Sequence, residues 1–215
     1  MMKKNFSVKI KNFISKLISL SPNLLAFKHL LRSNIRSYKI DLQSIHNLFL
    51  IKTVGTKSAL DLGCGSVPKN MFSADEIKGL DLIENNAENV FKCKLGFERI
   101  PFADNTFDYL TAYDLIEHIP RFSEVSENGP PFIFFMNECY RVLKKGGVFL
   151  SKTPVYPYLG AFQDPTHNNI ITIDTFRLYF SNEKYDVAKH YGIDADFKII
   201  DQKMYYQWLI AVMTK

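Results

Sequence analysis

The sequence predicts an α/β fold with a mostly parallel sheet of seven strands. After Gly55, short runs rich in β-branched and aromatic residues alternate with helical stretches, a pattern typical of parallel strands joined by crossover helices. The last two predicted strands, residues 197–206 and 208–214, follow each other so closely that they must form an antiparallel hairpin. A length of 215 residues suits one such domain.

Five further strands are predicted from short apolar runs between turn-forming residues. A helix is expected over residues 132–143, where apolar side chains recur at helical spacing. Gly146 and Gly147 are expected to end this helix, because glycine readily adopts the left-handed conformation found at helix ends. The predicted strands cover residues 58–62, 77–81, 90–94, 107–113 and 147–152.

The N-terminal segment differs in charge from the rest of the chain. Residues 1–40 carry nine Lys or Arg and no acidic residue, and apolar side chains from Phe6 to Ile18 recur every three or four positions. We therefore expect residues 1–52 to form a basic helical cap on a main domain of residues 53–215. A basic amphipathic helix can also bind an anionic membrane surface, which we expect as a secondary role at the inner face of the membrane.

Composition narrows the class of function. Residues 41–215 hold 18 basic and 22 acidic residues, a net charge of −4 that argues against a nucleic-acid substrate. The three cysteines are widely spaced without a CxxC pair, so no metal site is predicted and a reducing cytoplasm is expected. Lysines interrupt the early apolar residues, and no apolar run approaches the ~20 residues of a membrane span.

A glycine-bearing turn follows the first predicted strand. In the string ALDLGCG, Gly63 and Gly65 allow the backbone to turn sharply and to approach a ligand. Asp81 comes twenty residues after Asp61, at the end of the next strand, where a carboxylate can accept hydrogen bonds from both hydroxyls of a ribose. This combination predicts a nucleoside-containing cofactor.

Two kinds of cofactor fit a strand, a glycine turn and a terminal acid. Dinucleotide enzymes normally have a third glycine, but here Gly65 is followed by Ser66 and Val67. Asp61 precedes the first glycine, where its carboxylate could hold the turn and face the ammonium of an amino-acid moiety. The missing glycine disfavours a nicotinamide cofactor.

Four sequence blocks resemble the class I S-adenosylmethionine-dependent methyltransferases. The blocks LDLGCG, GLDL, IPFADNTFDYLTAYDLIEHIP and RVLKKGGVFLSKTP cover about residues 57–154. They are most similar to the methyltransferase type 11 group, which includes members associated with bacterial polysaccharide and sugar modification. The segment AFQDPTHNNIIT, residues 161–172, resembles one seen in that sugar-linked subset. The resemblance implies a Rossmann-like fold and S-adenosylmethionine as the cofactor.

The resemblance also implies which residues bind the cofactor. Backbone groups near Leu95 and Gly96 would contact the adenine, because this sequence lacks the acidic residue that the family often has there. Asp81 and Leu82 would bind the ribose and the adenine edge. The methionine part would be lined by Asp61, Gly63, Cys64 and Gly65.

The end of the fourth predicted strand supplies further candidates. Tyr113 and Asp114 lie at the carboxyl edge of the sheet, where ligands bind in open α/β folds. His118 follows on the expected next helix, near the transferred methyl, and is predicted as the general base. His167 lies on a long irregular segment, residues 153–171, and is predicted to position the substrate. The alternative for each histidine is a purely structural role.

The sequence favours O-methylation of a saccharide or of a sugar-containing intermediate. The polar groups of the 153–171 segment suit sugar hydroxyls. A lipid or quinone acceptor is the alternative within the same class, because the apolar, basic N-terminus would suit it. From other classes, a nicotinamide-dependent oxidoreductase and a non-catalytic cofactor-binding protein remain open, since a fold alone does not prove turnover.

Overall fold

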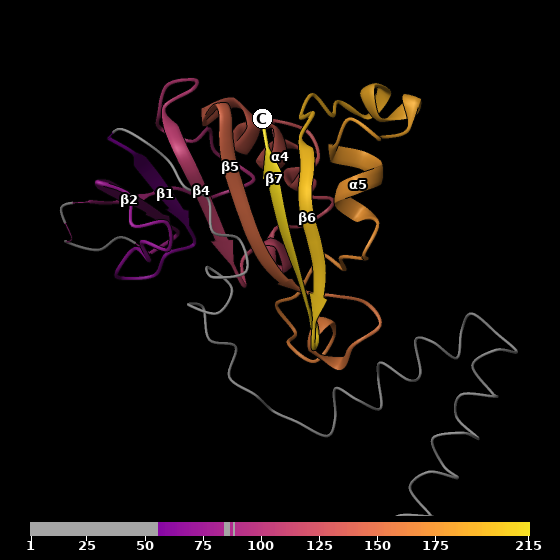
Figure 1. Cartoon of the computed structure of the whole chain (residues 1–215). Coiled ribbons are helices and arrows are strands. Elements are labelled where there is room, and N and C mark those ends of the chain that lie inside the picture. The colour runs from indigo at the N-terminus through magenta and orange to yellow at the C-terminus, as the bar shows by residue number, and fades with distance from the viewer. Residues whose placement is uncertain (1–55, 84–86, 88) are drawn as a thin grey trace, which may run out of the picture. The chain divides into compact units, whose positions relative to one another are not determined.

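The computed structural model describes residues 56–83, 87 and 89–215, which form a seven-stranded sheet (Figure 1). The strand order is β3-β2-β1-β4-β5-β7-β6. Only β7 runs antiparallel, paired with β5 on one side and β6 on the other. The predicted mostly parallel sheet with a C-terminal antiparallel hairpin is therefore confirmed. The strands are β1 (Ser58–Leu62), β2 (Glu76–Asp81), β3 (Val90–Lys92), β4 (Phe107–Tyr113), β5 (Leu143–Pro154), β6 (Lys198–Tyr205) and β7 (Trp208–Thr214).

The direction of chain winding reverses beside β1. From β1 the chain adds β2 and then β3 on one side, and returns to place β4 and β5 on the other. The carboxyl ends of β1, β2 and β4 consequently meet at one edge of the sheet, the lower edge in Figure 1. Such a reversal opens a crevice where ligands bind in α/β folds.

The helix α4 (Pro131–Val142) lies within one residue of its predicted bounds at each end. The prediction that Gly146 and Gly147 end this helix is wrong. Leu143 is already extended and pairs with Phe107 of β4, so the first residue of β5 ends the helix instead. Gly146, with a φ of +76°, bends the chain inside β5.

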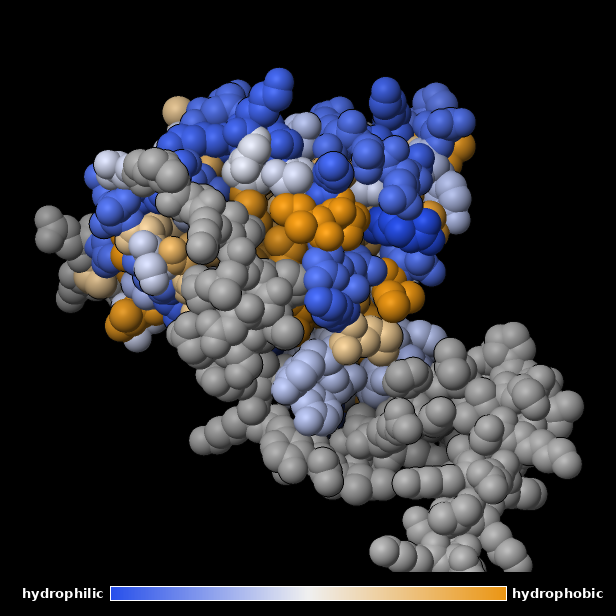
Figure 2. Space-filling view, in the orientation of Figure 1, coloured by the Kyte–Doolittle hydropathy of each residue, from blue (hydrophilic) through white to orange (hydrophobic). Residues whose placement is uncertain are grey.

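Side chains that alternate along the strands fill a core on each face of the sheet. On one face, the fully buried Leu110 and Phe149 belong to a cluster that includes Phe135 of α4. On the other face, Tyr109 and Leu150 belong to a second cluster. In Figure 1 α4 lies behind the sheet and α5 (Thr175–Phe180) beside β6. Figure 2 shows a hydrophobic area at the centre of the face turned toward the viewer, with hydrophilic surface above it.

The expected N-terminal cap, residues 1–52, lies outside the described residues, and its role stays a prediction. Within the described part of the chain, no helix has the length and apolar character needed to cross a lipid bilayer.

Candidate active site

A cavity of about 470 Å³ opens at the carboxyl ends of β1, β2 and β4, within the size range of small-molecule sites. Six of the residues predicted from the sequence line it: Gly63, Asp81, Leu82, Leu95, Asp114 and His118. The other lining residues are Cys93, Lys94, Phe97, Leu115, Ile119 and Pro120. The cavity thus joins the glycine turn, the acid after β2 and the segment after β4 in one site.

Gly63 permits the turn after β1. Its φ is +67°, and its amide donates a hydrogen bond to the carbonyl of Leu80 in β2 (2.8 Å). A Cβ at this position would lie 2.9 Å from Cδ1 of Leu115, which also lines the cavity. A side chain here would therefore strain the backbone and occupy the space next to the cavity.

Asp61 lies in β1, two residues before Gly63. Its side chain is buried, and its two oxygens accept hydrogen bonds from the Lys69 amide (2.8 Å) and from Oγ1 of Thr111 (2.6 Å). Burial raises the pKa of the Asp61 carboxyl, although both hydrogen bonds oppose the increase. The predicted structural part of its role is visible here, while contact with a cofactor ammonium stays a prediction.

Asp81 links the glycine turn to the cavity. Oδ2 accepts a hydrogen bond from the Gly65 amide (2.8 Å), and Oδ1 accepts one from the Ile83 amide (3.0 Å). A carboxylate has about four lone-pair sites, so two remain for ribose hydroxyls. The residues present therefore fit a nucleoside cofactor: an acid at the strand end beside a turn that a Cβ would fill.

Several residues predicted to bind the cofactor lie beside the cavity and do not line it. Cys64 is buried beneath the turn, where burial raises the pKa of its thiol to about 11. Gly96 packs closely, since a Cβ there would lie 2.8 Å from Cγ2 of Ile119. The Tyr113 hydroxyl is buried without a hydrogen-bond partner among the described residues, a condition that native proteins usually reserve for functional groups. Asp61 and Gly65 also lie outside the lining set.

The sequence analysis did not select six of the lining residues. Leu115, Ile119 and Pro120 belong to the segment that directly follows β4, and its position after a strand end was the signal that could have found them. Cys93 and Phe97 flank Leu95, so the stretch predicted to face the adenine lines the cavity with side chains as well.

Asp114 is engaged in contacts within the protein. Its carboxylate pairs with Nζ of Lys152 from β5 and accepts a hydrogen bond from Nε1 of Trp208 in β7 (3.0 Å). Its φ of +49° places it in the left-handed region. These contacts fix Asp114 at the rim of the cavity, where its predicted contact with the cofactor stays a prediction.

His118 lies on a short 3-10 turn, η1 (Ile116–His118), where the sequence analysis expected an ordinary helix. Pro120 follows two residues later and cannot donate the amide hydrogen bond that would extend a helix. The 153–171 segment folds onto this turn. The amides of Asn168 and Asn169 both donate to the carbonyl of Glu117, at 2.8 and 3.0 Å.

A hydrogen-bonded chain runs from this segment to His118. Oγ1 of Thr166 lies 2.6 Å from Oδ1 of Asp164 and 3.0 Å from Nδ1 of His118. Hydrogen bonds from Thr166 lower the pKa of the Asp164 carboxyl, so the carboxylate only accepts. Thr166 must then donate its single proton to Asp164 and accept from Nδ1–H of His118. In the neutral imidazole this assignment leaves the lone pair on Nε2.

Glu117 and His167 complete a cluster with His118. The two imidazole rings meet edge to face with centroids 4.8 Å apart. The His167 side chain is 9% exposed, and its Nδ1 has no hydrogen-bond partner among the described residues. Burial raises the pKa of the Glu117 carboxyl to about 7, and its Oε2 accepts a hydrogen bond from Oγ1 of Thr153 (2.9 Å).

The same cluster has the composition of a metal site. Glu117, His118 and His167 each offer one ligating atom, and these atoms lie within 4.8 Å of one another. Imidazole nitrogens with a carboxylate suit zinc and other first-row transition metals. The prediction of no metal site, made from the cysteine spacing, therefore remains to be tested.

Residues 60–151 match the family model described as a methyltransferase domain. The match covers less than half of the chain, so it shows that this part of the chain resembles a methyltransferase domain. Two curated relatives resemble the chain. Sterol 24-C-methyltransferase of Schizosaccharomyces pombe is 31% identical over 48% of the chain and 30% of its own length. Demethylmenaquinone methyltransferase of Staphylococcus aureus is 28% identical over 53% of the chain and 51% of its own length. The chain thus spans about half or less of the relatives that it matches.

Solved structures share the fold of this chain. A SAM-dependent methyltransferase from Archaeoglobus fulgidus superposes with a TM-score of 0.53 and 15% identity, over 81% of this chain and 93% of that one. A protein from Pyrococcus horikoshii superposes with a TM-score of 0.51 and 20% identity, over 86% and 90% of the two chains. These superpositions show that the chain shares the fold of a SAM-dependent methyltransferase.

Proposed function

We propose that the protein transfers a methyl group from S-adenosylmethionine to a hydroxyl of a saccharide or sugar-containing intermediate. The observation that carries this proposal is the polar segment folded against His118 at the rim of the cofactor cavity. Asp164, Thr166, His167 and Asn168 lie within six residues of that segment and offer donors and acceptors of the kind that sugar hydroxyls bind.

The residues of the cavity would hold the cofactor by its two ends. Asp81 and Leu82 would take the ribose and adenine side, and the turn at Gly63 the methionine side. Bound there, S-adenosylmethionine supplies a methyl group on a positively charged sulfur that leaves as a neutral thioether. The protein has to align the acceptor oxygen with that methyl, exclude water and accept one proton.

His118 is proposed as the residue that accepts this proton. Nε2 takes the proton of the attacking hydroxyl, while the hydrogen bond from Nδ1–H to Thr166 holds the ring in the required tautomer. Asp164, at the far end of the hydrogen-bonded chain, stabilises the imidazolium that results. His167 is proposed to position the acceptor, because its ring packs edge to face against the ring of His118.

A lipid or quinone acceptor is the second candidate. Two curated relatives carry the names of sterol and demethylmenaquinone methyltransferases, and this observation supports an apolar acceptor. Large apolar side chains are also exposed near the site, including Leu82 at 60% and Phe122 at 75%. Transfer of a labelled methyl group to a panel of sugar and quinone acceptors distinguishes the two candidates by which product carries the label.

The base assignment is tested with single variants once an acceptor is found. His118→Ala should lower the turnover rate ~10²- to 10⁴-fold, the usual effect of losing a general base, and leave the dissociation constant of S-adenosylhomocysteine unchanged. His167→Ala should mainly raise the Michaelis constant of the acceptor. His190→Ala, a change at an exposed histidine far along the chain from this cluster, is the matched control.

Two results would change the assignment. Loss of turnover in His167→Ala together with normal turnover in His118→Ala would exchange the two roles. Inactivation by a chelator, reversed by one divalent metal, would replace proton transfer to His118 by metal activation of the acceptor at the Glu117, His118 and His167 cluster.

A further inference from the structure

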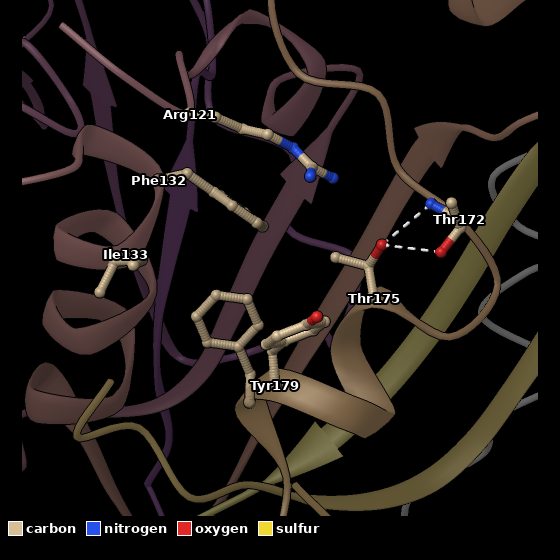
Figure 3. A pocket seen from close by; sticks show the side chains of 7 residues that line it. Arg121, Phe132, Ile133, Thr172, Thr175 and Tyr179 are labelled. Atoms are coloured by element: carbon tan, nitrogen blue, oxygen red, sulfur yellow. Dashed lines mark hydrogen bonds between the residues drawn. The ribbon is translucent and has the colours of Figure 1, made fainter. Parts of the chain in front are cut away.

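A second cavity, of about 260 Å³, lies on the other side of the segment that carries His118. Pro120 lines the cofactor cavity, and the next residue, Arg121, lines this one. Figure 3 shows the guanidinium of Arg121, the two threonines Thr172 and Thr175, and the ring of Tyr179 arranged around the same space. The cavity has therefore one charged group, three hydroxyls and an aromatic wall.

The cation at this cavity is held by two hydrogen bonds and has no carboxylate partner among the described residues. Nε of Arg121 donates to Oδ1 of Asn169 (2.7 Å), and Nη2 donates to the carbonyl of Ile170 (2.5 Å). Among the described residues Arg121 forms no ion pair, and the lining set contains no carboxylate. Its Nη1 donates to no partner in this part of the chain, so two N–H groups stay available for an anion.

The remaining lining residues suit a small ring with polar substituents. Phe132 and Phe180 are buried and meet edge to face at 5.1 Å, which gives the cavity an apolar floor. Oγ1 of Thr175 lies 3.0 Å from Oγ1 of Thr172 and also accepts a hydrogen bond from the Thr172 amide (2.9 Å). These bonds hold both hydroxyls at the wall of the cavity.

One buried side chain connects Arg121 to the turn of the proposed base. Asn169 is 1% exposed, and it donates from Nδ2 to the carbonyl of Ile116 (3.2 Å) while its Oδ1 holds the guanidinium. His118 and Arg121 are three residues apart, so their Cα atoms are separated by at most about 11 Å. The two cavities are thus lined by neighbouring residues of one segment.

We propose that this cavity binds an anionic oxygen group, carboxylate or phosphate, of the methyl acceptor. The acceptor is then an acidic or phosphorylated sugar compound, held at Arg121 by its charge and at His118 by the hydroxyl that receives the methyl group. This inference rests on the proposed function for its identification of the ligand as the acceptor. The anion site itself depends only on the arrangement around Arg121.

Binding of simple sugars to the full chain saturated with S-adenosylhomocysteine tests the proposal without any turnover. The probes are glucose 6-phosphate, glucuronate and neutral glucose. Binding of each probe is measured from the shifts of the backbone amide NMR signals of Thr172 and Thr175. We expect at least one acidic probe to bind at least tenfold more tightly than glucose. The stronger of the two acidic probes distinguishes phosphate from carboxylate as the recognised group.

Variants then locate the site. Arg121→Gln should abolish the preference for the acidic probe, and Arg121→Lys should restore only part of it, because lysine cannot make both anchoring bonds. Arg177→Gln is the control, since that arginine is on the neighbouring helix and is paired with Asp174 and Glu183. Melting temperatures and the dissociation constant of S-adenosylhomocysteine verify that each variant is folded.

Two outcomes would overturn the anion site: acidic probes that bind no more tightly than glucose, or a preference that survives in folded Arg121→Gln. A preference that depends on Arg121, combined with methyl transfer to neutral or apolar acceptors only, would retain the anion site and reject its role in acceptor binding. Failure of the proposed function is thereby kept separate from failure of this site.

Discussion

The cofactor side and the acceptor side of the site are assembled over different distances along the chain. On the cofactor side, Asp61 binds the amide of a residue eight positions away, and Asp81 binds amides two and sixteen positions away. On the acceptor side, His118 and Arg121 both find their partners 48 residues later in the 153–171 segment. The backbone contacts of the first half are thus short in sequence, although Asp61 also binds Thr111 fifty positions away, whereas the second half depends on a segment 48 residues distant.

This difference explains why the two halves are recognised so unequally. Residues that interact over short distances along the chain form a recognisable sequence pattern. The family match over residues 60–151 accordingly includes the turn at Gly63 and the acids Asp81, at the end of β2, and Asp114, directly after β4. Contacts over 48 residues leave no fixed spacing pattern, and the segment that would define the acceptor, including Thr166 and His167, lies outside the matched range. Substitutions on the two sides should therefore fail in different ways.

The largest effect on cofactor affinity is expected at Gly63. Gly63→Val should reduce the affinity for S-adenosylhomocysteine more than 100-fold, about 3 kcal/mol or more, because the side chain strains a φ of +67° and approaches Leu115 at the cavity. Gly65→Val is the matched comparison, since its φ is +66° and a Cβ there meets nothing within 4 Å. Titration calorimetry on both variants measures the difference. Equal affinities would mean that backbone strain alone matters and that Gly63 does not face the cofactor.

A smaller loss is expected at Asp81. Asp81→Ala should weaken binding of the same ligand by ~1 to 3 kcal/mol, because the ribose loses a charged hydrogen-bond acceptor. The affinity of Asp81→Asn should fall between those of the unchanged protein and Asp81→Ala, since the amide oxygen can still accept one hydrogen bond. The melting temperature of the free protein is the control for the lost bond to the Gly65 amide. An unchanged dissociation constant in folded Asp81→Ala would place the ribose elsewhere.

The smallest effect is expected on the acceptor side, at Thr166. Thr166→Val removes the hydroxyl between Asp164 and His118 and should lower turnover ~3- to 10-fold, the value of about one hydrogen bond, with no change in cofactor affinity. Thr166→Ser should restore turnover, because it keeps the hydroxyl. Steady-state kinetics of the two variants provide the measurement. If serine fails to rescue the rate, Thr166 acts only by packing.

Much of the fold follows directly from local sequence. The predicted strands at residues 58–62, 107–113 and 208–214 match β1, β4 and β7 at both ends, because each is an apolar run bounded by turn or polar residues. The glycine turn and the acid after β2 were also predictable, since close backbone approach and ribose recognition require those residue types at strand ends. Gly63, Asp81 and His118 line one cavity, and their predicted roles there stay predictions.

Other features were decided by contacts between distant segments. Pairing of Leu143 with Phe107 ended α4 before the glycines that sequence reasoning selected. The hydrogen bonds from Thr166 to His118 and from Arg121 to Asn169 depend on the 153–171 segment folding back over η1. The sequence by itself determined the glycine turn and the acid after β2, because each of these is a short run of residue types at a strand end. Tertiary structure alone decided the acceptor half, because its geometry depends on partners that only folding brings within hydrogen-bond distance.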